Sequence, residues 1–356
     1  MSPLSDSRVR EVLGKISYPG KSENLISSKI IEHLRVRDNS ILIILKYDEP
    51  NVQIRSQIHE TIKKTLEKEF SGYEINIKQV NTGGGTAAAP SPQTDPWAGR
   101  APIPNVKNIL AVASGKGGVG KSTVSTNLAI ALAAQDLKVG LMDSDIYGPS
   151  IHIMMGIRDK PLVSPDNKLL PSEKFGIKLM SMGFLVESDT PLIWRGPIVQ
   201  KAVTQFLQDV DWGELDILLV DLPPGTGDVQ LTLVQKTPLS GAVVVTTPQE
   251  VALVDARRAF HMFKKVETPV LGIIENMSYF TCTKCGEKHS IFGEGGGSHA
   301  AADLGVPFLG EIPITPQITA TGDEGIPMVA KAPDSEASLA FKQIALRILS
   351  SAAISK

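Results

Sequence analysis

The sequence predicts an α/β protein in which a small α+β domain precedes a mostly parallel, doubly wound sheet. Two observations predict the sheet: nearly continuous apolar runs that end in polar residues, and a glycine-rich loop directly after the first of them. Buried strands of a parallel sheet are apolar throughout because helices cover both faces. A third observation is the Gly-, Ala- and Pro-rich stretch at residues 81–104, which is typical of a linker between two domains.

Four elements are expected in the N-terminal domain, residues 1–80. Hydrophobic spacing predicts helices at 5–15 and 52–70, and apolar runs predict strands at 41–46 and 73–80. The chain has two cysteines, and neither of them lies in this domain. Because it cannot bind a metal through thiolates, the domain is expected to serve recognition or to be a relic.

Residues 105–356 are expected to form the second domain, in which five apolar runs predict strands at 109–113, 139–142, 217–220, 242–245 and 270–274. Residues 122–134, rich in Ala and Leu, are expected to form the helix that follows the first strand. A C-terminal helix that packs on its own domain is predicted from apolar residues at helical spacing: Ala337, Phe341, Ile344, Ala345 and Ile348.

A phosphate-binding loop lies between the first strand and its helix, where the sequence GKGGVGKS matches the pattern G-x-x-x-x-G-K-[ST]. Its glycines let backbone N–H groups turn toward phosphate oxygens, and the helix N-terminus adds partial positive charge. Lys121 is expected to reach the β- and γ-phosphates, and Ser122 to place its hydroxyl on Mg²⁺. The expected ATP-binding residues of the loop are Gly115, Lys116, Gly117, Gly118, Val119, Gly120, Lys121, Ser122 and Thr123.

Acidic residues follow two of the predicted strands: Asp143 and Asp145 follow 139–142, and Asp221 and Asp228 follow 217–220. Ligands of an open α/β sheet bind at the carboxyl ends of its strands, so these acids are expected beside the phosphate-binding loop. Each of them could instead cap a helix. Asp221 fits an acid that holds Mg²⁺ directly or through water, and Asp228 lies in a segment that a γ-phosphate could order. Asp143 is expected to support these groups.

The two cysteines, Cys282 and Cys285, form a C-x-x-C pair followed by Gly286. Two thiolates can converge on one metal centre, but a tetrahedral zinc site and a cubane cluster usually take four ligands. A two-fold dimer would supply the missing pair, because a symmetric interface places identical patches face to face. A redox dithiol and a zinc site are the alternatives. His289, nearby, is expected to be a solvated loop histidine.

Five motifs together resemble the Mrp/ApbC branch of the deviant Walker A ATPases, which are iron–sulfur cluster carriers. They are GKGGVGKST, DSDIYGPS, the IWRGP of residues 193–197, DLPPGTGD and the C-x-x-C loop. The resemblance covers roughly residues 105–350, and the N-terminal domain weakly resembles a SufT/PaaD-like iron–sulfur assembly domain.

The resemblance implies a homodimeric ATPase that assembles or carries a 4Fe–4S cluster between subunits and delivers it to apoproteins. It implies that Lys116 reaches the nucleotide of the other subunit, that Asp145 orients the attacking water, and that Asn276 reads the adenine edge. The alternative is a MinD/ParA-like positioning ATPase with a structural zinc at the C-x-x-C pair.

Composition narrows the class of partner. The formal net charge of −2 predicts no strong attraction to nucleic acid or an anionic membrane. No apolar stretch approaches the length of a membrane span, and the first residues mix acids and bases unlike a transit peptide. A cytoplasmic location is therefore expected, with no nucleic-acid or membrane partner.

Overall fold

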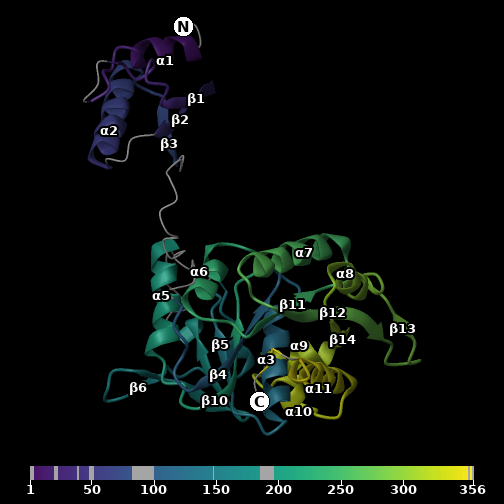
Figure 1. The fold of residues 1–356 in the computed structure, drawn as a ribbon. Coiled ribbons are helices and arrows are strands. Elements are labelled where there is room, and N and C mark those ends of the chain that lie inside the picture. The colour runs from purple at the N-terminus through teal and green to yellow at the C-terminus, as the bar shows by residue number, and fades with distance from the viewer. Residues whose placement is uncertain are drawn as a thin grey trace. The chain divides into compact units, whose positions relative to one another are not determined.

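The computed structural model describes residues 4–19, 23–37, 40–47, 52–81, 100–146, 148–184, 196–351 and 353–354. The chain divides into two compact units, Met1–Gln93 and Thr94–Lys356 (Figure 1). Each unit has a hydrophobic core of its own. Most of the predicted linker, residues 82–99, lies outside the described residues.

The first unit is a three-stranded sheet with two helices. Its elements are α1 (Asp6–Leu13), β1 (Ile31–Arg37), β2 (Ser40–Tyr47), α2 (Val52–Glu69) and β3 (Glu74–Asn81). The strand order is β1-β2-β3, antiparallel between the first pair and parallel between the second. The four expected elements are present, whereas β1 was not predicted because its alternate residues are charged or histidine.

The second unit is a nine-stranded, mostly parallel sheet. Its strands are β4 (Val106–Ala113), β5 (Val139–Asp143), β8 (Ser172–Lys174), β9 (Ile177–Ser181), β10 (Leu215–Asp221), β11 (Gly241–Thr246), β12 (Val270–Thr281), β13 (Lys288–His289) and β14 (Phe308–Ile314). The parallel strands run in the order β14-β12-β11-β4-β10-β5-β9, while β8 and β13 pair antiparallel with β9 and β12. A separate short pair is β6 (Leu162–Val163) and β7 (Leu169–Leu170).

Helices cover both faces of this sheet, as the sequence predicts for a doubly wound fold. They are α3 (Lys121–Ala133), α4 (Ile151–Met154), the 3₁₀ turn η1 (Met182–Phe184), α5 (Gly196–Asp209), α6 (Asp228–Lys236), α7 (Glu250–Lys265), α8 (Gly296–Leu304), α9 (Pro316–Asp323), α10 (Met328–Lys331) and α11 (Glu336–Leu349). Figure 1 shows α7 and α8 over one face and α3 with α9–α11 over the other. The five residues predicted to anchor the C-terminal helix are buried in α11, which packs on α3 and β14.

Strand β12 departs from the prediction in length. The expected strand ended at residue 274, but β12 continues to Thr281 and carries the chain to the cysteines. Met277 has a left-handed backbone with φ of 56°, and the pairing with β14 shifts register between Asn276 and Phe280. The irregular segment separates the buried first half of the strand from its half-buried end, which explains why the apolar pattern stops early.

Candidate functional site

The phosphate-binding loop connects β4 to α3 in a conformation that depends on glycine. Gly118 and Gly120 have φ values of 82° and 78°, in the left-handed region that glycine adopts without a steric penalty. A Cβ on Gly115 would lie 2.0 Å from the carbonyl carbon and oxygen of Asp255, so α7 packs directly on the loop. The helix α3 begins at Lys121, and its N-terminus faces the loop as the motif requires.

Lys121, Ser122 and Asp221 meet at the start of α3. The Lys121 ammonium lies 2.6 Å from Oδ2 of Asp221, and the Ser122 hydroxyl donates to the same oxygen at 2.7 Å. Asp221 ends β10 and is fully buried, and Lys121 is 6% exposed. The structure thus brings together the lysine and the acid that the sequence predicts, although 100 residues separate them.

Ser125 is a member of this cluster that sequence reasoning missed. Its hydroxyl donates to Oδ1 of Asp221 at 2.5 Å, while its own side chain is fully buried. Both oxygens of Asp221 therefore have hydrogen-bond donors, which stabilise the buried carboxylate. Ser125 lies one helical turn after Lys121, a spacing that could have indicated a shared face.

Asp143 lies at the end of β5, where it is in register with Asp221 of β10. It is fully buried, and its carboxylate accepts hydrogen bonds from the Ser181 hydroxyl at 2.8 Å and the backbone N–H of Ile151 at 3.2 Å. Burial, followed by repulsion from Asp221, raises the pKa of Asp143 to about 7. The structure thus places Asp143 beside Asp221, and its predicted supporting role stays a prediction.

The remaining predicted residues of the ATPase chemistry are divided between buried and exposed positions. Asp145 is 9% exposed, and its Oδ1 accepts from the backbone N–H of Gly148 at 3.3 Å. The Lys116 side chain is exposed, and its predicted reach to another subunit stays a prediction. Asp228 starts α6, but its side chain lies outside what the structure describes, as do residues 193–195 of the motif at 193–197.

Asn276 is packed against the phosphate-binding loop. Its side-chain Nδ2 donates to the carbonyl oxygen of Val119 at 2.8 Å, and the residue is 6% exposed. A Cβ on Gly120 would lie 2.2 Å from the same nitrogen, so the contact requires a glycine there. The structure therefore assigns Asn276 a contact with the loop, and its predicted reading of adenine stays a prediction.

The cysteines lie on a hairpin that follows β12 and returns as β13. Cys282 is half-buried and Cys285 is exposed, and both are free thiols. The Cys282 N–H donates to the carbonyl oxygen of Glu287 at 2.8 Å, and the Gly286 N–H donates to that of Cys282 at 2.9 Å. Backbone N–H groups of Cys285 and Lys284 lower the pKa of the Cys282 thiol. Such a turn favours the thiolate, the form that binds metal.

The hairpin alone does not complete a metal site. Within the described part of the chain, no group of three or more His, Cys, Asp or Glu side chains is placed to hold a metal ion. His289 is half-exposed, and its Nε2 lies 3.9 Å from a Glu287 oxygen, as expected for a solvated histidine. Two thiolates from each of two copies would satisfy a four-ligand centre.

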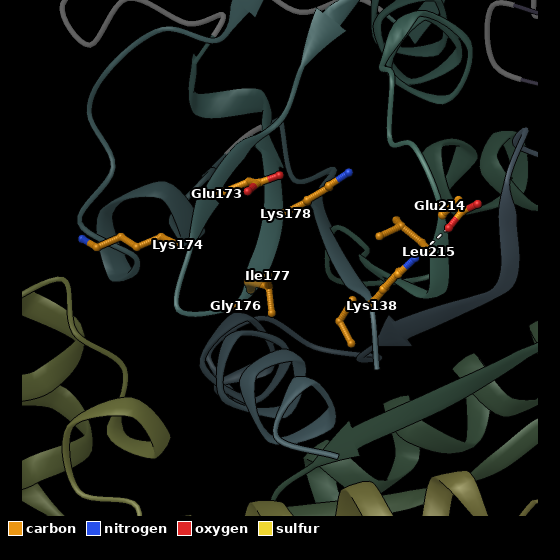
Figure 2. Close-up of a pocket in the computed structure, with 9 residues that line it drawn as sticks. Lys138, Glu173, Lys174, Gly176, Ile177, Lys178, Glu214 and Leu215 are labelled. Carbon is orange, nitrogen blue, oxygen red and sulfur yellow. Dashed lines mark hydrogen bonds and ion pairs between the residues drawn. The ribbon is translucent and has the colours of Figure 1, made fainter. Parts of the chain in front are cut away.

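A separate cavity of about 620 Å³ lies at the opposite edge of the sheet, where β5, β9 and β10 begin. Figure 2 shows Lys138 and Glu214 forming an ion pair at its wall, with a distance of 2.6 Å. None of the predicted site residues lines this cavity. The predicted catalytic groups lie at the carboxyl ends of the strands instead, where ligands of open α/β sheets bind.

Comparisons with known proteins agree with this geometry. Residues 105–349 match the ParA family described as NUBPL iron-transfer P-loop NTPases. An iron-sulfur cluster carrier protein of Synechocystis is 41% identical over 351 residues, which cover 97% of each chain.

Two solved structures share the fold of the second unit. A nucleotide-binding protein in complex with ADP from Archaeoglobus fulgidus is 43% identical, with a TM-score of 0.56 over 62% of this chain and 87% of that one. The cell division ATPase MinD of Pyrococcus furiosus is 23% identical, with a TM-score of 0.52 over 68% of this chain and 98% of that one, a likeness that shows the fold alone.

Proposed function

The chain belongs to the ParA/NUBPL family of iron-transfer P-loop NTPases, and from that premise we propose that it is an ATP-hydrolysing carrier that assembles or transfers a 4Fe–4S cluster to apoproteins. One observation supports the proposal above the others. The strand β12 contacts the phosphate-binding loop through Asn276 and ends at the exposed C-x-x-C hairpin. A single strand thus joins a nucleotide site to a pair of thiols suited to metal.

In the proposed reaction, Lys121 turns from Asp221 toward the phosphate oxygens of ATP. The Ser122 hydroxyl oxygen lies 2.7 Å from Oδ2 of Asp221, and Mg²⁺ prefers oxygen ligands of this kind. They would hold the magnesium ion, which supplies positive charge to the β- and γ-phosphates. Because a buried carboxylate without a cation is costly, we expect nucleotide and magnesium to bind cooperatively.

Lys116 and Asp145 complete the proposed hydrolysis. Asp145 orients the water that attacks the γ-phosphorus, and Lys116 of one subunit stabilises the charge that develops in the other subunit. The exposure of Lys116 supports that role, which requires a homodimer. The cluster is cargo in this scheme: Cys282 and Cys285 of two subunits bind it, and client apoproteins receive it.

Anaerobic reconstitution with iron and sulfide tests this proposal. We expect about four iron atoms per dimer, a 4Fe–4S absorption band, and no cluster in the monomer fraction from gel filtration. A Cys282→Ala/Cys285→Ala variant should bind no cluster and retain most ATPase activity, because no thiol enters the phosphoryl chemistry. Stoichiometric zinc after anaerobic purification, with no cluster obtained by reconstitution, would replace the carrier with a structural zinc site.

The positioning ATPase considered from the sequence lacks comparable support. The similarity of this chain to MinD is limited to the fold. A positioning function would also give the C-x-x-C pair no role. Among the helices that the structure describes, none is both long and apolar enough to span a membrane. The cytoplasmic location expected from the sequence stays a prediction, and cell fractionation would test it.

A further inference from the structure

One carboxylate ties both strands of the cysteine hairpin, residues 279–289, to the start of α11. The Tyr279 hydroxyl donates to Glu336 Oε1 at 2.9 Å, and the Thr281 hydroxyl donates to Oε2 at 3.3 Å. From the returning strand, the Lys288 ammonium lies 3.5 Å from Glu336 Oε1 and 4.0 Å from the centre of the Tyr279 ring. Three donors from two strands therefore converge on Glu336.

The pairing of Phe280 with Ile314 of β14 holds the base of the hairpin, and beyond that pair the hairpin has little packing of its own. Residues 283–294 are all exposed. A cavity of about 400 Å³ lies beneath the hairpin, bounded by residues 280–283 on one wall and by 313–317, Met328 and 335–337 on the other. A cavity removes the van der Waals contacts that would otherwise fix a surface element. Within the described residues, the side-chain hydrogen bonds that leave the hairpin all end on Glu336.

Glu336 also belongs to the element that supports the nucleotide site. It is the first residue of α11, and the buried face of that helix packs on α3. α3 begins at Lys121, directly after the phosphate-binding loop. The contacts with Glu336 thus connect the cysteine hairpin to α11 and, through α11, to α3, which begins at Lys121.

We propose that Glu336 is a positioning residue for the cluster: it holds the cysteine hairpin on α11, so that Cys282 keeps a fixed place relative to the phosphate-binding helix. This inference deepens the proposed function, on which its cluster readout rests. Without Glu336, the hairpin moves over the cavity, and the two thiols no longer present a rigid pair to the partner subunit.

Hydrogen–deuterium exchange of the full chain tests whether Glu336 holds the hairpin in place. The measurement is made in the presence of a reductant and a chelator, so that no cluster is bound. In Glu336→Gln, we expect the amides of residues 279–289 to exchange about tenfold faster than in the wild type, the factor that corresponds to one lost charged hydrogen bond. Glu287→Gln is the matched control, because Glu287 is an exposed acid on the same hairpin and its carboxylate faces His289, also on the hairpin. It should exchange at the wild-type rate.

Tyr279→Phe is a second test that preserves charge and ring packing and removes the 2.9 Å hydrogen bond. It should raise exchange in the same segment, and it decides the question if Glu336→Gln fails to fold. Wild-type exchange in both variants, or equal acceleration in Glu287→Gln, would overturn the inference.

The cluster readout is the rate at which a chelator removes iron from the reconstituted protein. This rate should rise about tenfold in Glu336→Gln, while basal ATPase activity stays unchanged. In Glu336→Asp, which keeps the carboxylate, the rate should lie between those of the wild type and Glu336→Gln. If the wild type holds no cluster, the proposed function fails and the exchange experiment still decides the role of Glu336. If the wild type holds a cluster that Glu336→Gln releases no faster, the positioning role alone is wrong.

Discussion

Replacing Asp143 with Asn tests how much the buried acid pair destabilises the second unit. The pKa of Asp143 is raised from 3.8 to about 7, because the carboxylate is buried and faces Asp221. At about 1.4 kcal/mol per unit of pKa difference between the folded and unfolded chains, this corresponds to roughly 4 kcal/mol. A raised pKa favours the folded state at low pH, so this stability is present below about pH 4 and is lost as the pH rises through 7.

The substitution removes the charge but also a hydrogen bond. The two carboxylate oxygens of Asp143 each accept from a backbone N–H, one from Asp145 and one from Ile151, both at 3.2 Å. The amide nitrogen of Asn cannot accept, so one of these bonds is lost, which costs about 1–3 kcal/mol. We therefore expect Asp143→Asn to be less stable than the wild type at pH 4.5. At pH 8 the difference should vanish or reverse, because the wild type alone loses the roughly 4 kcal/mol worked out above.

Urea unfolding followed by tryptophan fluorescence measures this difference. The three tryptophans lie at positions 97, 194 and 212, all in the second unit, so their emission does not report the first. The measurement is made with EDTA and without nucleotide, from pH 4.5 to 8. Parallel pH dependences of the unfolding free energy in wild type and variant would refute the reasoning. They would mean that the pKa of Asp143 is the same in the folded and the unfolded chain.

Three further results are expected. Lys121→Ala should abolish ATP hydrolysis, whereas Lys116→Ala should preserve much of the nucleotide binding and lower turnover; calorimetry and phosphate release separate the two, and wild-type turnover in Lys116→Ala would exclude the action in trans. Gly120→Ala should weaken nucleotide binding about tenfold or more, because its Cβ would meet the Asn276 amide at 2.2 Å on a left-handed backbone that costs roughly 1–2 kcal/mol; an unchanged ATP-dependent thermal shift would contradict this. A shortened chain that starts at Arg100 should still bind ATP and reconstitute a cluster, since Arg100 bonds the carbonyl of Val266 at 3.1 Å and belongs to the second unit; loss of the cluster with ATP binding intact would assign the N-terminal unit a part in it.

The sequence was most informative where burial makes a strand apolar throughout. The five predicted strands of the second unit are all present, and their sequences are apolar because helices cover both faces of the sheet. β14 was missed because its Gly310, Glu311 and Pro313 contradict strand propensity, and its place beside β12 comes from tertiary packing. β9 was missed because a lysine interrupts its short apolar run.

Within the candidate site, local patterns predicted residue types but not most contacts. The phosphate loop, Asp221 and the cysteine pair could be read from motifs, since each depends on near neighbours in the chain. The meeting of Lys121 with Asp221, and of the hairpin with Glu336, joins residues 48 to 100 positions apart. Pairings of that kind are determined by the packing of the whole sheet, which no local pattern contains.

The length of β12 has a consequence for how the two ends of the molecule communicate. Asn276 and Cys282 are six positions apart, and between them lie the left-handed Met277 and a register shift against β14, so the segment is shorter than six residues of extended strand. In the proposed function, a change at the nucleotide would reach the thiols through the backbone of β12, because that strand contacts the loop through Asn276 and leads to Cys282. The displacement of the thiols would then be set by how far the loop moves Asn276.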